Sequence, residues 1–455
     1  MRRLPILLLF FLSGVSALIY QTSWIRQTTL IFGVSVYAYS VVLAAFMGGS
    51  ALGTAWMGRR ADRAVSGLGV FAGLQVGVAL FGLPIPFVLP ALMPVYAGIA
   101  RSLPVDSWLL TAVRAFFSVL VLIPPTFLMG ASLPVMARAI ARRAGAVGAA
   151  VGQLYAAETL GAAIGCGLAG LFLLRILGTQ QTVFIAVALN LLAAAGAWRV
   201  SRHTTPTTEE TNHKDTKTQR KAGSGKWQAA SGKSQVADND PQPATRNPQF
   251  AIRNSQLLAA YTLSGFVALG YEVVWARILA VFTLDAVFSF SMMLATYLLG
   301  LTLGGWIGAG WMKRRRVVWA DFAALQAALG LAALGTIFVF AWLPGLALED
   351  IFGGYSVTNL ILYEFLLGFL SLILPTTLLG LLFPVVVSLY TGEETSAVGQ
   401  GVGHIAALNT AGAILGSLVV GFGLIPWLGL QSTLILLGLV NLLIGAGGFW
   451  MEREK

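Results

Sequence analysis

The sequence predicts an all-α polytopic membrane protein with twelve transmembrane helices, arranged as two parallel six-helix repeats. The first observation is composition. The chain has 455 residues, of which 57% are hydrophobic and only 10% charged, and its mean hydropathy is +0.80, so a water-soluble core cannot account for its apolar stretches. The second observation is an internal repeat, because the two halves carry the same residue types about 251 positions apart. Such a repeat is typical of a duplicated membrane unit.

The repeat runs through the whole of each half. It preserves aromatic residues, arginines and glycines, which set helix packing and helix ends. The matched pairs include Tyr20 and Tyr271, Trp24 and Trp275, Arg26 and Arg277, Gly165 and Gly416, and Gly178 and Gly429. A single chance motif would not keep its register over this distance, so duplication is the best explanation.

Apolar segments long enough to cross about 30 Å of hydrocarbon occur six times in each half. In the first half they lie at 5–31, 36–58, 67–92, 107–136, 150–174 and 180–198. In the second half they lie at 257–283, 286–311, 317–343, 357–389, 399–424 and 430–450. Because each half has an even number of spans, the two repeats enter the membrane in the same direction.

A polar segment separates the two predicted bundles. Residues 199–255 are rich in Thr, Lys, Gln, Asn and Ser and have almost no apolar run, which is typical of a disordered linker. We therefore expect an N-terminal bundle over 1–198 and a C-terminal bundle over 256–455.

Basic residues collect on one side of the predicted membrane. They include Arg2, Arg3, the loop 59–63, Arg138 and the run 313–316, and Lys and Arg concentrate in cytoplasmic loops. We expect a multi-pass protein of the cytoplasmic (inner) membrane, with both termini and the linker in the cytoplasm. The net charge of +11 follows this distribution, so it does not indicate a nucleic-acid partner.

The loop after the second predicted span resembles a motif of the major facilitator superfamily. Gly58, Asp62 and Arg63 fit the pattern G-x-x-x-D-R/K, although the rest of the motif is replaced by 64–67. The resemblance implies two bundles that rock around a central site. It also implies that Asp62 and Arg63 clamp neighbouring helix ends and gate the cytoplasmic side.

The opening of each half resembles the membrane portion of fused spermidine-synthase-like proteins. The resemblance rests on Ser13-Gly14, Tyr20, Trp24 and Arg26, and the repeat carries the same pattern. It weakly implies polyamine-like substrates. The sequence has no Gly-rich strand-to-helix turn that could hold a nucleoside, so the soluble aminopropyltransferase activity of those proteins is not carried over.

Ionisable residues inside predicted spans are functional suspects, because a charge at the bilayer centre costs about 2.5–3.5 kcal/mol on insertion scales. Glu158 is expected near the midplane, where it is a candidate proton carrier, a counter-ion for an amine, or a partner of Tyr155. Arg114 and Glu364 are expected at equal depth, where they form either a structural ion pair or an outer gate. His404 is a candidate for proton coupling or for a helix–helix hydrogen bond.

Glu272 replaces Gln21 of the first half and stands beside aromatic residues, which suits a cationic ligand. The candidate substrate-binding residues are Tyr20, Gln21, Trp24, Glu158, Tyr271, Glu272, Trp275 and Asn409. The candidate gating residues are Arg114, Glu364, Asp62, Arg63, Arg26 and Arg277. The candidate proton-coupling residues are Glu158, Glu272 and His404. The aromatic pairs could instead be packing or interface residues, and the two outer arginines could simply reach toward the membrane surface.

These observations favour a secondary transporter of a small polar solute, with a cationic, polyamine-like solute as the finer expectation. The alternative is a non-transporting membrane module that partners a separate soluble aminopropyltransferase-like enzyme. No clustered His, Asp and Glu set and no nucleophile with a base occurs in the sequence, so we expect no enzymatic activity, no metal and no cofactor.

Overall fold

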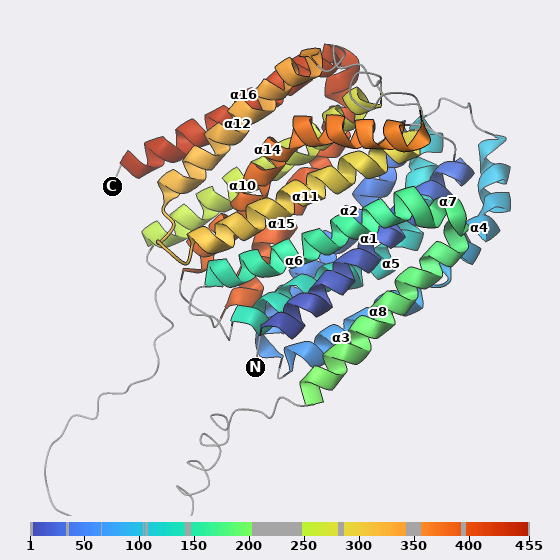
Figure 1. The fold of residues 1–455 in the computed structure, drawn as a ribbon, viewed down its shortest axis with the longest axis horizontal. Coiled ribbons are helices and arrows are strands. Elements are labelled where there is room, and N and C mark those ends of the chain that lie inside the picture. The colour runs from blue at the N-terminus through green and yellow to red at the C-terminus, as the bar shows by residue number, and fades with distance from the viewer. Residues whose placement is uncertain are drawn as a thin grey trace, which may run out of the picture.

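The computed structural model describes residues 3–32, 36–64, 66–102, 104, 108–141, 147–202, 248–280, 286–342, 356–392 and 397–453. Within these residues the regular structure is helical throughout. The fold is an all-α membrane protein whose helices form two six-span bundles, as the sequence predicts (Figure 1).

The first bundle contains spans formed by single helices and by helices broken at turns. Its elements are α1 (Leu4–Phe32), α2 (Val36–Arg63), α3 (Gly67–Gly82), α4 (Ile85–Ala100), α5 (Trp108–Ala141), α6 (Val147–Leu168), η1 (Ala169–Leu173), α7 (Leu174–Ile176) and α8 (Gly178–Arg202). Helices α3 and α4 are bent by 40° at their junction, and together they are long and apolar enough to supply the third span. Pro84 stands at this bend, where its missing backbone N–H and its ring favour an interruption of the helix.

The second bundle repeats this order. Its elements are α10 (Pro248–Leu279), α11 (Ala286–Trp311), α12 (Trp319–Trp342), α14 (Val357–Thr391), α15 (Val398–Val419), η3 (Val420–Leu424) and α16 (Ile425–Arg453). The 55-residue apolar run Val398–Glu452 is too long for one crossing and turns at Gly429, which has a φ of 77°. It therefore supplies the last two spans.

The break before the last span is the same in both halves. A π-helical turn, η1 or η3, is followed by a glycine with positive φ, 76° at Gly178 and 77° at Gly429. Glycine populates this backbone region without the clash that a Cβ would cause. Sequence duplication has thus preserved a local backbone feature and not only the helix count.

The ends of the predicted linker are helical. Helix α8 continues to Arg202 and α10 begins at Pro248, so helical structure covers a few residues at each end of the segment 199–255. The guanidinium of Arg202 lies 3.5 Å from the ring centre of Trp198, a contact one helical turn apart that favours the extended end of α8. The rest of the predicted linker, 203–247, lies outside the described residues.

Glycines let the helices of each bundle approach backbone to backbone. A Cβ on Gly14 of α1 would collide with the carbonyl oxygen of Glu158 on α6, and a Cβ on Gly265 of α10 would collide with that of Asn409 on α15. Membrane helices that associate through small residues use this kind of contact. The pairing α1 with α6 is therefore repeated as α10 with α15.

The two bundles meet along two helix pairs, α2 with α15 and α6 with α11 (Figure 1). On α6 and α11 the Thr302 hydroxyl donates to the Thr159 hydroxyl at 3.0 Å, and the Cys166 thiol donates to the Ser291 carbonyl at 3.5 Å. The N- and C-terminal marks stand at the same end of the helices, where α8 ends and α10 begins. We refer to that end as the inner end and to the opposite one as the outer end.

Candidate functional site

A cavity of about 240 Å³ lies between the two bundles. Side chains of both halves line it, from α1, α2 and α6 on one side and from α10, α11, α14 and α15 on the other. Its polar lining residues include Gln21, Tyr155, Tyr261, Glu272, Tyr297 and Asn409. A chamber between two repeats is where membrane transporters of this architecture place their ligands.

The cavity follows the internal repeat. Repeat partners line it from opposite sides, among them Leu18 with Leu269, Leu43 with Leu294, and Met47 with Leu298. The partners Gln21 and Glu272 both line the cavity and are 7% and 6% exposed. The cavity therefore has matched apolar walls and mismatched polar groups, with the carboxylate on the C-terminal side only.

Three tyrosines accompany this carboxylate. Tyr297 lies close enough to Glu272, Tyr155 and Tyr261 to interact electrostatically with each of them. Tyrosine hydroxyls and ring faces both favour a cation beside a carboxylate. Tyr261 and Tyr297 are not among the residues predicted from the sequence to bind substrate. The repeat distinguishes both, because their partners in the first half are Phe10 and Phe46.

The aromatic pairs predicted to bind substrate are packed elsewhere. Tyr20 stacks on Trp24 with ring centres 4.8 Å apart, and Tyr271 stacks on Trp275 at 5.1 Å. All four side chains are fully buried.

The contacts of the second pair show where these rings point. The Tyr271 hydroxyl accepts from Asn441 of α16 at 3.1 Å, and the Trp275 indole donates to Thr336 of α12 at 3.3 Å. Both rings therefore fill the core of their own bundle instead of lining the cavity. This placement differs from the expectation because neighbouring residues on a helix lie about 100° apart, so Gln21 and Glu272 face the cavity and the tyrosines beside them do not.

Glu158 lies beside the cavity lining. It is half-buried on α6, one turn from the lining residue Tyr155, with which it interacts electrostatically. Its repeat partner Asn409 lines the cavity directly. His404 is half-buried on α15, nearer the inner end than Asn409. The structure thus brings Glu272, Gln21 and Asn409 together, with Glu158 next to them through Tyr155.

The arginines predicted as gates lie toward the outer end. The Arg26 guanidinium donates to the Leu174 carbonyl at 3.4 Å, which ties α1 to α7, and Arg277 is half-buried near the end of α10. The Arg114 guanidinium donates to the Tyr96 hydroxyl of α4 at 3.0 Å. The side chain of Glu364 lies outside the described residues, so the predicted pair of Arg114 with Glu364 stays a prediction.

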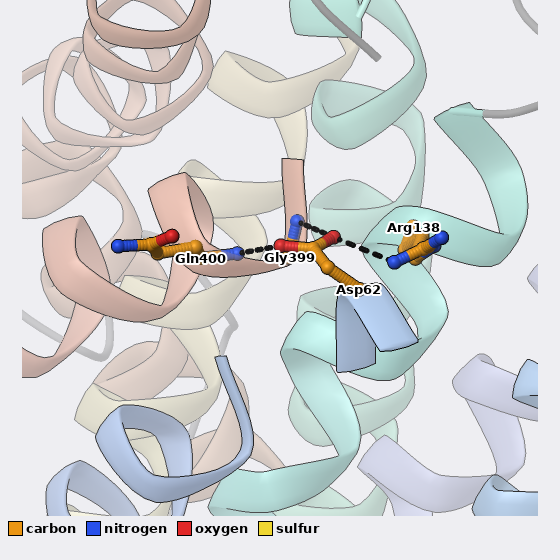
Figure 2. A network of polar contacts seen from close by, with 4 residues as sticks. All are labelled: Asp62, Arg138, Gly399 and Gln400. Carbon is orange, nitrogen blue, oxygen red and sulfur yellow. Dashed lines mark hydrogen bonds and ion pairs between the residues drawn. The ribbon is translucent and has the colours of Figure 1, made fainter. Parts of the chain in front are cut away.

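Asp62 joins the two bundles at the inner end (Figure 2). Its carboxylate accepts from the backbone N–H groups of Gly399 at 2.9 Å and Gln400 at 2.7 Å. It also pairs with the Arg138 guanidinium at 3.1 Å. The first N–H groups of a helix lack partners within the helix and carry partial positive charge. Asp62 therefore caps α15 across the boundary between the halves, and we call these four residues the inner latch.

The inner latch differs from the expectation in one residue. Arg63 was predicted to act with Asp62, but its side chain is exposed, and the cation beside Asp62 is Arg138 of α5. Consecutive helical residues point in different directions. A basic residue next to the aspartate in sequence is for this reason not its partner in space.

The equivalent loop of the second half carries a different ion pair. Asp321 pairs with Arg315 at 2.5 Å and accepts from the backbone N–H of Val318 at 2.8 Å. These residues are neighbours in sequence, so this ion pair caps the start of α12 and does not bridge the bundles. Among the described residues, no group of three or more His, Cys, Asp or Glu side chains could hold a metal ion.

No protein-family model and no curated protein matches the sequence. Solved transporter structures do share the fold. The human organic anion transporter MFSD10 (TETRAN) aligns with a TM-score of 0.55 and 14% identity, over 98% of this chain and 99% of its own. The nucleoside transporter NupG aligns with a TM-score of 0.55 and 14% identity over 100% of both chains. The likeness establishes a major-facilitator-like fold.

Proposed function

We propose that the protein is a secondary transporter that carries a small solute by alternating access. The observation that carries this proposal is the cavity between the bundles, which is lined from both halves and contains a carboxylate, an amide pair and tyrosines. Polar groups buried in a bilayer are costly and mark ligand pathways. The solved structures of similar fold are of membrane transporters, which supports the same class of function.

The cavity chemistry favours a small organic cation as the solute. Glu272 supplies a counter-ion, Tyr261 and Tyr297 supply ring faces and hydroxyls, and Gln21 and Asn409 supply amide partners. Leucines cover much of the remaining wall, which suits the methylene segments of an aliphatic amine. The resemblance to spermidine-synthase-like membrane portions supports a polyamine-like solute, and that resemblance rests on the sequence motif alone.

We further propose that the inner latch is the cytoplasmic gate. The positive-inside distribution of Arg and Lys supports a cytoplasmic inner end. The structure then corresponds to a state whose cytoplasmic side is closed by Asp62, Arg138, Gly399 and Gln400. Release of the solute to the cytoplasm requires these contacts to break, because α2 and α15 must separate there.

Uptake into proteoliposomes tests the proposal. Vesicles containing the full chain should accumulate labelled spermidine above protein-free vesicles, and Glu272→Gln should reduce that uptake severalfold because the cation loses its counter-ion. Glu452→Gln, at the far end of α16, is the matched control and should keep wild-type uptake. Equal uptake by Glu272→Gln and wild type would refute the cation site.

The broader proposal has its own test. If a panel of polyamines, amino acids and nucleosides is neither transported nor bound by folded protein, the transporter assignment is wrong. Co-purification of a soluble aminopropyltransferase-like enzyme with such an inactive protein would instead support the non-transporting membrane module.

A further inference from the structure

A second hollow lies on the membrane side of the boundary between the bundles. It has a volume of about 420 Å³ and is formed by α2, α5 and α15, a size within the roughly 300–1,000 Å³ range of small-molecule sites. We call it the α2–α15 crevice. Its lining includes Ala44, Gly48, Leu52, Val119, Ile123 and Ile414.

The lining of the α2–α15 crevice is entirely apolar in side-chain type, being made of alanine, glycine, valine, leucine and isoleucine. Leu52 and Val119 are 56% and 38% exposed, so the crevice opens outward from the helices. Water does not fill a site of this kind, because apolar cavities offer it no hydrogen-bond partners. At this depth in a bilayer the medium outside is hydrocarbon.

The crevice lies well away from the inner latch. Leu52 is ten residues before Asp62 on α2, which at 1.5 Å per residue places it about 15 Å toward the outer end. On α15 the lining residue Ile414 is likewise toward the outer end of the helix that begins at Val398. The halves are therefore joined by charged contacts at the inner end, and farther out the α2–α15 crevice leaves an apolar gap along one side of their boundary.

One helix wall separates the crevice from the central cavity. Leu43 and Met47 of α2 face the cavity, whereas Ala44 and Gly48 on the same turns line the crevice. Leu43 and Met47 pack with Leu269 of α10 and Ala413 of α15 to close this wall. The contact is between apolar side chains, so nothing polar at this level competes with hydrocarbon for the gap.

We propose that the α2–α15 crevice binds one acyl chain of a bilayer lipid, wedged between the two halves of the protein. The gap leaves its lining without dispersion partners on one side, and a hydrocarbon chain restores those contacts. Lipid tails are as apolar as leucine side chains, so a chain replaces helix–helix packing here at little cost. A chain in the crevice therefore stabilises the arrangement of α2 and α15 in which the inner latch is formed. The proposal does not depend on the nature of the transported solute.

The test uses the full chain reconstituted in phosphatidylcholine vesicles that contain a small fraction of phosphatidylcholine with a diazirine on one acyl chain. After irradiation and digestion, mass spectrometry locates the labelled residues. We expect labelling to concentrate on 44–52 and 411–418, well above that on the exposed face of α12 that carries Leu331 and Phe338. Equal labelling of the two regions would show only general lipid contact and would overturn the proposal.

Glycine variants make the test specific. A Cβ added at Gly48 would lie 3.9 Å from the Ile414 Cδ1, so a larger side chain there would project toward Ile414. Gly335 of α12 has open space around it. Gly48→Leu should reduce labelling of the crevice by about tenfold, as expected for a loss of about 1.4 kcal/mol, and Gly335→Leu should leave it unchanged. Ala51→Leu fills the crevice from a second position and serves if Gly48→Leu does not fold. Undiminished labelling in a folded filling variant would overturn the proposal.

Discussion

At the residue scale, Asp62 shows how one side chain can hold two bundles together. It satisfies two N–H groups at the start of α15 and one guanidinium from α5, all from a position at the end of α2. Each hydrogen bond to a charged group contributes about 1.5–3 kcal/mol to the free energy of unfolding. The repeat partner of Asp62 is Lys313, so the second half cannot form the same latch.

Replacing Asp62 tests the inner latch directly. Asp62→Asn should lower the free energy of unfolding by about 2 kcal/mol, because Arg138 loses its counter-ion and the helix cap is weakened. Asp321→Asn removes a carboxylate that pairs only within its own loop and is the matched control for solvent access to the inner end. Two measurements should change in Asp62→Asn: unfolding in mixed micelles, and the labelling of a cysteine introduced near Gly399. In Asp321→Asn the labelling of that cysteine should not change. Unaltered labelling in Asp62→Asn would contradict the latch.

The membrane carboxylates allow a second prediction at this scale. If Glu158 and Glu272 carry protons during transport, the double variant Glu158→Gln with Glu272→Gln should lose the part of uptake that depends on a pH gradient. Glutamine has nearly the same size as glutamate and still forms hydrogen bonds, but its amide does not take up a proton near neutral pH. Uptake into vesicles with and without an imposed gradient measures the effect. A response to the gradient equal to that of wild type would eliminate both residues as proton carriers.

At the element scale, the α2–α15 pair depends on glycine near the inner end. A Cβ on Gly403 would lie 2.8 Å from the Gly58 Cα and 3.0 Å from the Thr54 carbonyl oxygen. These are backbone atoms that cannot move aside independently of their helix, so the two helices must separate if Gly403 is enlarged.

Gly403→Ala should therefore destabilise the protein by about 1–3 kcal/mol, the usual cost of overpacking. The control is Gly310→Ala on α11, where a Cβ would have no neighbouring atom within 4 Å outside its own helix turn. That variant should be neutral or more stable by up to about 1 kcal/mol, because alanine is the better helix former. Thermal unfolding of both variants in the same detergent compares them. A Gly403→Ala protein as stable as wild type would show that α2 and α15 are not held this closely.

How much the sequence could predict also depends on scale. The duplicated bundles, the twelve spans and the break before each last span follow from periodic apolar runs and from repeated glycines such as Gly178 and Gly429. The direction in which a single side chain points was harder to predict. Tyr271 and Glu272 are adjacent, and only the rotation of α10 against its neighbours decides which one lines the cavity. Arg138 could not be assigned to Asp62, because no local pattern connects α2 with α5.

At the scale of the whole molecule, the two bundles are alike in scaffold and unlike in charge. The apolar walls of the cavity are matched across the repeat, whereas the carboxylates of Glu272 and Asp62 have no carboxylate as repeat partner. Symmetric walls allow the bundles to pack similarly in two orientations, and the asymmetric groups can favour one of them. Transport by rocking then requires the inner ends of the bundles to separate.

A reversible crosslink between the bundles tests this requirement. At the inner end Gly148 of α6 faces Ser388 of α14, and a Cβ added at position 148 would lie 2.7 Å from the Ser388 Cβ. Two cysteines at these positions are therefore close enough for a disulfide once the backbone adjusts. In a background with Cys166→Ala, the pair Gly148→Cys and Ser388→Cys should stop uptake under oxidant and regain it after reduction, because the closed inner end cannot open.

The matched control crosslinks residues within one bundle. The hydroxyls of Ser66 and Ser201 lie 2.8 Å apart, and both belong to the first half, so the pair Ser66→Cys and Ser201→Cys should form a disulfide and leave uptake unchanged. The comparison separates a lock between bundles from general stiffening of the fold. If the pair at Gly148 and Ser388 is fully oxidised and uptake continues at the wild-type rate, the two bundles do not separate at this end during transport, and the rocking mechanism is excluded.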